Sequence, residues 1–310
     1  MKILITGGAG FIGASLIPML LEKKYEVTVL DNLMYGGYPL LPFFKYSNFN
    51  FVKGDIRDRE ILKNVMKNSE IVIHLAAIVG YGACRKDPKL AHDVNFLGTK
   101  NIVDNLSKNQ YIFFASTGSN YGELKDTICT EKTPLKPLSI YGKTKTAGEK
   151  YVIENAQKYV AYRFATAFGV SPRFRLDLLP NEFVYQAVTQ KYLVVYEKHF
   201  MRTFIHVRDM ANSFLFAINN LDIMTNQVYN VGSKKLNYSK EEICNMIVKE
   251  TGAYVHYAEV GSDADKRNYV VSYEKIRKLG YRTTISFEEG IKELIRSIPT
   301  IQINNPYLNG

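Results

Sequence analysis

Tyr141 and Lys145, in the run Y-G-K-T-K, are the residues of this chain best suited to acid/base chemistry. Residues four apart lie on one face of a helix, about one turn from each other. A free tyrosine has a pKa of about 10 and is a poor base at neutral pH. A neighbouring ammonium favours the phenolate and lowers that pKa. This spacing therefore makes Tyr141 a candidate acid/base for a substrate hydroxyl.

The Tyr-Lys pattern alone is weak, because Y-x-x-x-K also arises by chance. Two other features support it: Ser116 and Thr117 precede it along the chain, and a glycine-rich run, G-G-A-G-F-I-G, occupies residues 7–13. Thr117 follows an apolar run at 110–115, and the carboxyl end of a strand is where ligands bind in open α/β sheets. Together these features predict a nucleotide-dependent enzyme.

The first thirty residues predict a dinucleotide-binding unit. An apolar strand at 2–6 precedes the glycines, a helix is expected at 11–23, and a second strand at 25–30 ends at Asp31. Glycines allow a tight turn and close approach to a pyrophosphate, while the helix N-terminus offers amide hydrogens. The spacing is G-x-x-G-x-x-G. Asp31 is placed to bind ribose hydroxyls and to repel a 2′-phosphate, so NAD is expected rather than NADP.

Alternation of strands and helices continues to about residue 168. Strands are expected at 48–53, 70–75, 110–115 and 159–166, and helices at 58–66, 90–107 and 141–158. This pattern predicts an α/β fold with a Rossmann-type, doubly wound parallel sheet. A loop of about eighteen residues is expected after Gly122. Asp55 and Ile56 would meet the adenine, and Asp55 could instead, or in addition, cap the helix at 58–66.

Beyond residue 168 the alternation becomes irregular. Strands are expected at 203–206 and 227–231, and helices at 209–219 and 239–250, the last with a capping box formed by Ser239 and Glu242. We therefore predict a NAD-binding domain at 1–168 and a smaller α/β substrate-binding domain at 169–310. The chain is expected to cross back from the second domain onto the first.

The composition of the chain indicates which class of ligand it binds. The chain has 310 residues and a formal charge of +10, with basic residues dispersed. This favours a phosphate-bearing small ligand over nucleic acid. No apolar run is long enough to span a bilayer. The cysteines Cys84, Cys129 and Cys244 lack metal-ligand spacing, so we expect no metal and a reduced, cytoplasmic protein. His74 is interpreted as structural.

Five motifs occur in one order: G-G-A-G-F-I-G, H-L-A-A, S-T-x-x-x-Y-G, Y-x-x-x-K and R-T-F-I-H-V-R-D. In this the chain resembles the extended short-chain dehydrogenase/reductases over about residues 1–295. More narrowly it resembles the NAD-dependent nucleotide-sugar epimerase/dehydratase group. Within that group it looks closest to GDP-heptose 4-dehydrogenases of bacterial capsule polysaccharide pathways.

The resemblance implies a role for each matching residue. Tyr141 would take the proton of the sugar C4 hydroxyl, Lys145 would bond the nicotinamide ribose and lower the tyrosine pKa, and Thr117 would hydrogen-bond the C4 oxygen. The cofactor would be lined by Gly7, Gly10, Phe11, Ile12, Gly13, Asp31, Asn32, Asp55, Ile56, Leu75, Ala76, Ala77, Asn95, Tyr141 and Lys145. The nucleotide-diphosphate sugar would contact Val79, Thr117, Gly118, Ser119, Asn181, Arg202 and Arg267.

Departures from the family pattern separate the possible reactions. The 4,6-dehydratases carry an Asp-Glu pair after the threonine, where this chain has Gly118 and Ser119. The 3,5-epimerases need a base in the same loop, and Cys129 is interpreted as structural. C4 oxidation therefore remains, alone or as part of 4-epimerisation of a UDP- or GDP-sugar. The resemblance implies that the oxidised substrate is a GDP-heptose or GDP-hexose. A non-catalytic NAD-binding protein is disfavoured, because Tyr141 and Lys145 are both present.

The resemblance also implies a homodimer. The helices at 90–107 and 145–158 would pair with their copies as a four-helix bundle. The alternative is that the apolar faces of these helices belong to the core of one chain.

Overall fold

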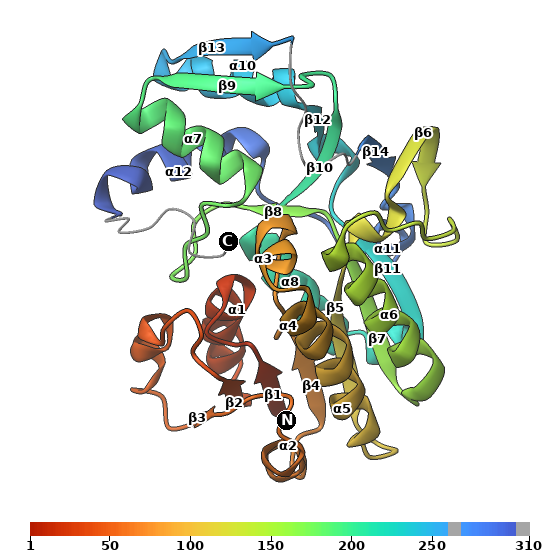
Figure 1. Ribbon diagram of the computed structural model, residues 1–310. Helices are drawn as coiled ribbons and strands as arrows, with labels where there is room; N and C mark the ends of the chain where they lie inside the picture. The colour runs from red at the N-terminus through yellow and green to blue at the C-terminus, as the bar shows by residue number, and fades with distance from the viewer. Residues whose placement is uncertain (260–267, 302–310) are drawn as a thin grey trace.

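The computed structural model describes residues 1–259 and 268–301, without the side chains of 123–127 and 268. A seven-stranded sheet fills the lower part of the molecule in Figure 1, and smaller sheets and helices lie above it. All neighbours in the large sheet run parallel, in the order β11-β7-β5-β4-β1-β2-β3. The predicted fold class is confirmed.

The large sheet is buried on both faces. Its strands are β1 (Lys2–Thr6), β2 (Glu26–Asp31), β3 (Phe49–Lys53), β4 (Ile71–His74), β5 (Tyr111–Thr117), β7 (Tyr159–Phe164) and β11 (Gln227–Val231). Successive side chains of a strand point to opposite faces. Accordingly Ile3 and Ile5 pack into one hydrophobic cluster and Leu4 into another. Burial on both sides explains why the inner strands β1 and β4 are nearly continuous apolar runs.

Helices cover each face of this sheet. One face packs against α1 (Phe11–Glu22) and α8 (Val207–Ile218). The other packs against α2 (Arg59–Met66), α6 (Ile140–Asn155) and the helix made of α4 (Pro88–His92), a π-helical turn (Asp93–Gly98) and α5 (Thr99–Asp104). The π-helical turn lies inside the helix predicted at 90–107.

The upper region has its own small core. It is built from the sheet β12-β10-β8 (Asn237–Ser239, Met201–His206 and Thr166–Phe168) and the pair β9 (Tyr192–Tyr196) and β13 (Tyr254–Ala258). Three helices pack there: α7 (Leu179–Thr189), α10 (Lys240–Thr251) and α12 (Phe287–Ser297). The predicted capping box of α10 is confirmed, since Ser239 and Glu242 exchange both bonds. The chain returns to the large sheet through β11.

Several elements were not predicted. The stretch interpreted as a loop after Gly122 contains β6 (Glu123–Cys129), which pairs in parallel with β14 (Asn268–Val271). Short helices lie at α3 (Tyr81–Lys86), α9 (Leu221–Met224) and α11 (Glu274–Lys278). None of the helices in the described part of the chain combines the length and apolar composition needed to cross a bilayer.

Candidate active site

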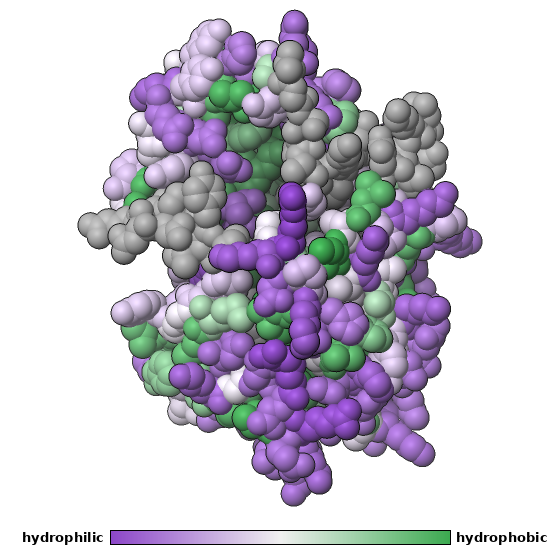
Figure 2. Space-filling model, in the orientation of Figure 1, coloured by the Kyte–Doolittle hydropathy of each residue, from purple (hydrophilic) through white to green (hydrophobic). Residues whose placement is uncertain are grey.

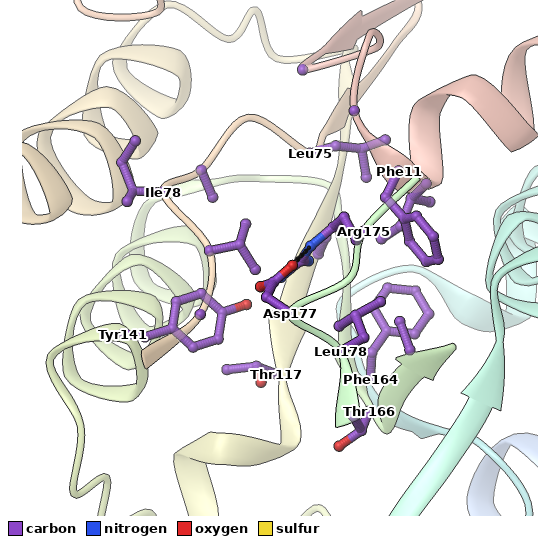
Figure 3. A pocket seen from close by; sticks show the side chains of 18 of the residues that line it. Phe11, Leu75, Ile78, Thr117, Tyr141, Phe164, Thr166, Arg175, Asp177 and Leu178 are labelled. Atoms are coloured by element: carbon purple, nitrogen blue, oxygen red, sulfur yellow. Dashed lines mark hydrogen bonds and ion pairs between the residues drawn. The ribbon is translucent and has the colours of Figure 1, made fainter. Parts of the chain in front are cut away.

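A cavity of about 720 Å³ lies at the carboxyl ends of β1, β2, β4 and β5 and extends up to β9, β10 and α10. Figure 3 shows part of its wall, with Phe11 and Leu75 on one side and Tyr141 and Thr117 on the other. We call the wall formed by residues 7–13, 30–36, 54–56 and 75–77 the glycine-loop half. We call the wall formed by Arg173, Arg175, Asp177, Glu182, Arg202 and Lys240 the arginine half.

The glycine turn between β1 and α1 admits no side chain at two positions. A Cβ on Gly7, where φ is +73°, would lie 2.6 Å from the backbone nitrogen of Ala76. A Cβ on Gly13 would lie 2.4 Å from the carbonyl oxygen of Gly8. Helix α1 starts after Gly10, and no side chain in the described part of the chain caps it. Its first amides thus face the cavity as an anion-binding end.

Asp31 ends β2 beside this turn. Its carboxylate accepts hydrogen bonds from the backbone nitrogens of Ala9 (2.9 Å) and Leu33 (2.8 Å). Burial raises the pKa of Asp31, and these two bonds oppose that rise. A carboxylate has about four acceptor sites, so capacity remains for a ribose diol.

Asp55 lies on the same edge of the cavity, after β3. Its carboxylate pairs with the Arg57 guanidinium at 2.9 and 2.8 Å and accepts a bond from Asn32 at 3.1 Å. The bond from Arg57 is the main cause that lowers the pKa of Asp55 to about 2. The alternative interpretation of Asp55 as a helix cap is wrong, because the side chain of Asp58 caps α2.

Tyr141, Lys145 and Thr117 all line the cavity. Ser139 caps α6, so Tyr141 lies in its first turn. Thr117 is the last residue of β5, and its hydroxyl accepts a bond from the backbone nitrogen of Ser119 at 3.1 Å. Figure 3 shows the Tyr141 hydroxyl pointing into the cavity, with Thr117 below it.

Lys145 is nearly inaccessible, at 2% exposed. Its ammonium lies 4.1 Å from the centre of the Phe114 ring. Burial lowers the pKa of Lys145 to about 7, although Glu149, one turn along α6, opposes the fall. The Lys145 ammonium, which is expected to lower the pKa of Tyr141, therefore loses its own proton near neutral pH.

A buried ion pair holds the middle of α6 to the sheet. Arg163 of β7 donates to Glu149 at 2.6 Å, with side chains 6% and 1% exposed. The same carboxylate accepts bonds from Ser116 (2.5 Å) and Asn120 (3.1 Å). Because Ser116 precedes Thr117, this network fixes α6 relative to the end of β5.

His74 and Asn95 belong to a second buried network. His74 contacts Thr6 at 2.8 Å and Thr99 at 2.9 Å, and burial keeps its pKa well below the ordinary value. Asn95, in the π-helical turn, accepts from the Ile78 nitrogen and donates to the Ile78 oxygen and to Thr144.

Most of the predicted site residues lie on the cavity wall, but Asn95, Asn181 and Gly118 do not. Asn95 and Asn181 are fully buried, and Asn181 bonds Gly169 and the Arg175 carbonyl oxygen. Gly118 packs against Tyr269 and Phe164 rather than lining the cavity. Arg267 lies outside the described residues. The roles predicted for Asn95, Asn181 and Gly118 would have to be indirect.

The arginine half contains residues that the sequence did not single out for the site. They are Arg173, Arg175, Asp177, Glu182 and Lys240. Lys240 is 2% exposed and donates to the Tyr196 carbonyl oxygen at 3.0 Å. Two arginines beside Pro172 were a visible signal, but their direction depends on how the chain folds after β8.

Residues 3–232 match the model of a family described as the NAD dependent epimerase/dehydratase family. The chain belongs to this family. A putative UDP-glucose 4-epimerase of Methanocaldococcus jannaschii is 30% identical, covering 94% of this chain and 97% of its own. Among solved structures, the UDP-glucuronic acid 4-epimerase of Bacillus cereus in complex with UDP-glucuronic acid and NAD aligns with a TM-score of 0.86 at 27% identity, over 97% and 99% of the two chains. The Thermus thermophilus UDP-glucose 4-epimerase complex with NAD aligns at 0.82 and 26%, over 96% and 99%.

NAD is the cofactor of this epimerase/dehydratase family, and the glycine-loop half fits it. Gly10 to Gly13, where α1 begins, line this wall, no side chain among the described residues caps the helix there, and Asp31 has acceptor capacity left. Within the described residues, no group of three or more His, Cys, Asp or Glu side chains could hold a metal ion.

Proposed function

We propose that this protein oxidises C4 of a nucleotide-diphosphate sugar with NAD, with Tyr141 as the base. The observation that supports this proposal best is that Tyr141, Lys145 and Thr117 line one cavity with the glycine turn. Acid/base chemistry and a dinucleotide site thus share one space.

Tyr141 and Thr117 have separate roles in this reaction. Tyr141 removes the proton of the C4 hydroxyl, while the Thr117 hydroxyl bonds the C4 oxygen and holds it in place. The O–H and C–H bonds at C4 break and a C=O bond forms. NAD, when bound, takes up the hydrogen with its electron pair from C4. Breaking both bonds in concert avoids a free alkoxide, and fixed geometry lowers the barrier further.

The substrate class follows from the other end of the cavity. Arg202 is 3% exposed and Lys240 2%, and both line the cavity near β9 and β10. An arginine fork pairs with two phosphate oxygens, and lysine adds a point charge. We propose that these cations hold the diphosphate. We propose a GDP-heptose or GDP-hexose as substrate and a place in capsule polysaccharide biosynthesis on the sequence resemblance alone, and a cytoplasmic location on the cysteine usage.

The absence of carboxylates after Thr117 favours oxidation without dehydration. Gly118 and Ser119 occupy these positions, and neither can protonate a leaving hydroxyl. We therefore expect a 4-keto sugar that keeps all of its hydroxyl groups except the one oxidised.

The test is incubation of the protein with NAD and a panel of nucleotide sugars, including a GDP-heptose, GDP-mannose and UDP-glucose. NADH absorbance and product mass are followed together. We expect one substrate to lose two mass units as NADH accumulates. If no substrate is changed in mass or configuration, the proposal is wrong.

A second candidate is 4-epimerisation of a UDP- or GDP-sugar. It is favoured by the relatives, since the Methanocaldococcus jannaschii protein is named a putative UDP-glucose 4-epimerase. The same residues would serve, with hydrogen returned to the other face of C4. Separating substrate from epimer by chromatography distinguishes the two: an epimer of unchanged mass without NADH supports this candidate.

We also propose a homodimer formed through α4, α5 and α6. Leu97 and Tyr81 are each 39% exposed beside these helices. Figure 2 shows mostly hydrophilic residues over the lower front of the molecule, with separate apolar residues among them. Light scattering should give about twice the 35.4 kDa chain mass. One chain mass would reject the dimer.

A further inference from the structure

The loop between β8 and α7 is held firmly against the glycine turn. Ser171 donates to the Phe11 carbonyl oxygen at 2.7 Å, and Asn181 donates to the Arg175 carbonyl oxygen at 2.8 Å. Leu178 packs in a cluster with Phe11 and Val207. The backbone on both sides of Arg175 and Asp177 is therefore fixed, and their side chains enter the cavity from a defined position.

Arg175 and Asp177 form a two-bond ion pair in that cavity. The Nε atom of Arg175 lies 3.0 Å from Oδ1 of Asp177, and Nη2 lies 2.6 Å from Oδ2. Their side chains are only 11% and 25% exposed. Figure 3 shows the pair between Leu75 and Leu178, with the Asp177 carboxylate on the side of Tyr141.

Gly80 makes room for this pair. It has a φ of +98°, and a Cβ there would lie 3.3 Å from Oδ2 of Asp177 and 3.8 Å from Nη2 of Arg175. The pair thus spans the cavity from the β8–α7 loop to the segment after β4. It lies where the glycine-loop half and the arginine half meet.

In the described part of the chain, Lys145 of α6 and Arg175 and Asp177 of the β8–α7 loop line the cavity together with Tyr141. Further titratable groups on the surrounding elements include Tyr35, Tyr81, Cys84, His74, Glu149, Arg173 and Glu182. Burial raises the pKa of Cys84 to about 11 and holds that of His74 far below its ordinary value, so both are neutral. Arg173 lies over the Tyr35 ring at 4.8 Å.

Arg175 and Tyr141 line the same cavity, so a guanidinium and a tyrosinate there would attract each other. Burial disfavours the charged guanidinium, but the attraction of Asp177, and beyond it of Tyr141 and Tyr35, raises the pKa of Arg175 overall. The interaction is mutual, so the guanidinium favours the tyrosinate just as the tyrosinate favours the guanidinium.

We propose that Arg175 is a positioning residue for the reaction, a second cation that favours the anionic form of Tyr141, and that Asp177 orients it and partly offsets its charge. This inference rests on the proposed function, since it concerns the base of that reaction. It explains why a mostly buried ion pair projects into the cavity instead of an apolar side chain. Lys145 and Arg175 would then act on the same phenol from two sides.

The proposal predicts opposite effects from the two halves of the pair. Arg175→Gln removes a positive charge, so the acid limb of kcat/KM should move to higher pH by about one unit. Asp177→Asn leaves the guanidinium unopposed, so the limb should move to lower pH by a similar amount. The double variant restores neutrality and should return close to wild type.

Ionisation can also be read without substrate. The protein has 22 tyrosines, so the ultraviolet titration of Tyr141→Phe is subtracted from that of each protein that retains Tyr141. The remaining tyrosinate signal should show the same opposite shifts. If the wild type turns over no nucleotide sugar, the proposed function fails, but this titration still tests Arg175.

Arg277→Gln is the matched control. Arg277 forms a similar ion pair with Glu274 on the surface of α11, through Nε at 2.9 Å to both carboxylate oxygens and through Nη2 at 2.6 Å. It should leave both readouts unchanged. Shifts in the same direction for Arg175→Gln and Asp177→Asn, or lost activity with an unmoved limb and titration, would overturn the proposal and leave the pair a purely structural one.

Discussion

The two halves of the cavity are formed by different kinds of chemical groups. The glycine-loop half is mainly backbone and small side chains, such as Gly7, Gly13 and Ala76, with one carboxylate at Asp31. The arginine half is made of long charged side chains, Arg175, Arg202 and Lys240 among them, and they come from different elements. The glycine-loop half would bind a ligand through the shape and the backbone amides of a turn. The arginine half would bind a ligand through charged side chains.

This difference shows how each half should respond to mutation. A backbone site is sensitive to any added atom, because a Cβ meets main chain that cannot move aside. A side-chain site loses affinity one hydrogen bond at a time, by about 1.5–3 kcal/mol for a bond to a charged group. Substitution of a reacting group such as Tyr141 should change the reaction rate most.

The largest effect on the reaction rate is expected from Tyr141→Phe. The change removes only the hydroxyl that exchanges the proton, so kcat should fall by about 10²- to 10⁴-fold. Affinity for NADH, followed by its fluorescence, should stay near that of the wild type. Turnover close to the wild-type rate would mean that another group is the base.

The next effect is expected from Gly13→Ala in the glycine-loop half. The new Cβ would lie 2.4–2.7 Å from backbone atoms of Gly8, so unfolding free energy should fall by about 1–3 kcal/mol or more and NADH binding should weaken.

Gly280→Ala is its control, since no atom lies within 4 Å of the added Cβ, although its φ of +104° is unfavourable. The control should lose stability but keep NADH affinity. Equal loss of NADH affinity in both variants would argue against a backbone-defined site.

Arg202→Gln probes the arginine half. Losing a charge-assisted contact with a phosphate should raise KM for the nucleotide sugar by about 10- to 100-fold, with NADH affinity preserved. Arg208→Gln is a control on the neighbouring helix, since Arg208 pairs with Glu293 at 2.9 Å on the surface. A KM that changes equally in both variants would remove Arg202 from the diphosphate site.

A pH-dependent effect on stability is expected from the buried amine of Lys145. Lys145 has its pKa lowered from 10.5 to about 7, so above pH 7 the unfolded chain binds a proton that the folded chain does not. Stability relative to Lys145→Met should therefore rise with pH between about 7 and 10, by roughly 1.4 kcal/mol per unit at most. Denaturant unfolding at several pH values measures it. A difference independent of pH would show that the amine is not desolvated.

The glycine-loop half could be predicted from sequence because its parts are neighbours along the chain. Strand β1, the turn, α1 and β2 follow one another within thirty-one residues, so spacing alone placed Gly7, Gly13 and Asp31 together. The capping box of α10 is equally local.

The arginine half could not be predicted in this way. Arg175 was visible as a charge beside prolines, but only the contacts of Ser171 with Phe11 and of Asn181 with the loop direct it into the cavity. Pairing of β6 with β14 joins residues more than a hundred positions apart. Asn181 was expected at the diphosphate and instead supports the loop. Long-range packing decided each of these outcomes.

The central claim is net oxidation: hydrogen leaves C4 of a nucleotide sugar for NAD and is not returned to the sugar. A nucleotide sugar carrying deuterium at C4 tests it most directly, with mass spectrometry of the cofactor and the sugar after a single turnover. The account predicts that the deuterium is found on the reduced cofactor and is missing from a 4-keto sugar. A reduced cofactor without deuterium, or deuterium retained at C4 of a converted product, would contradict it.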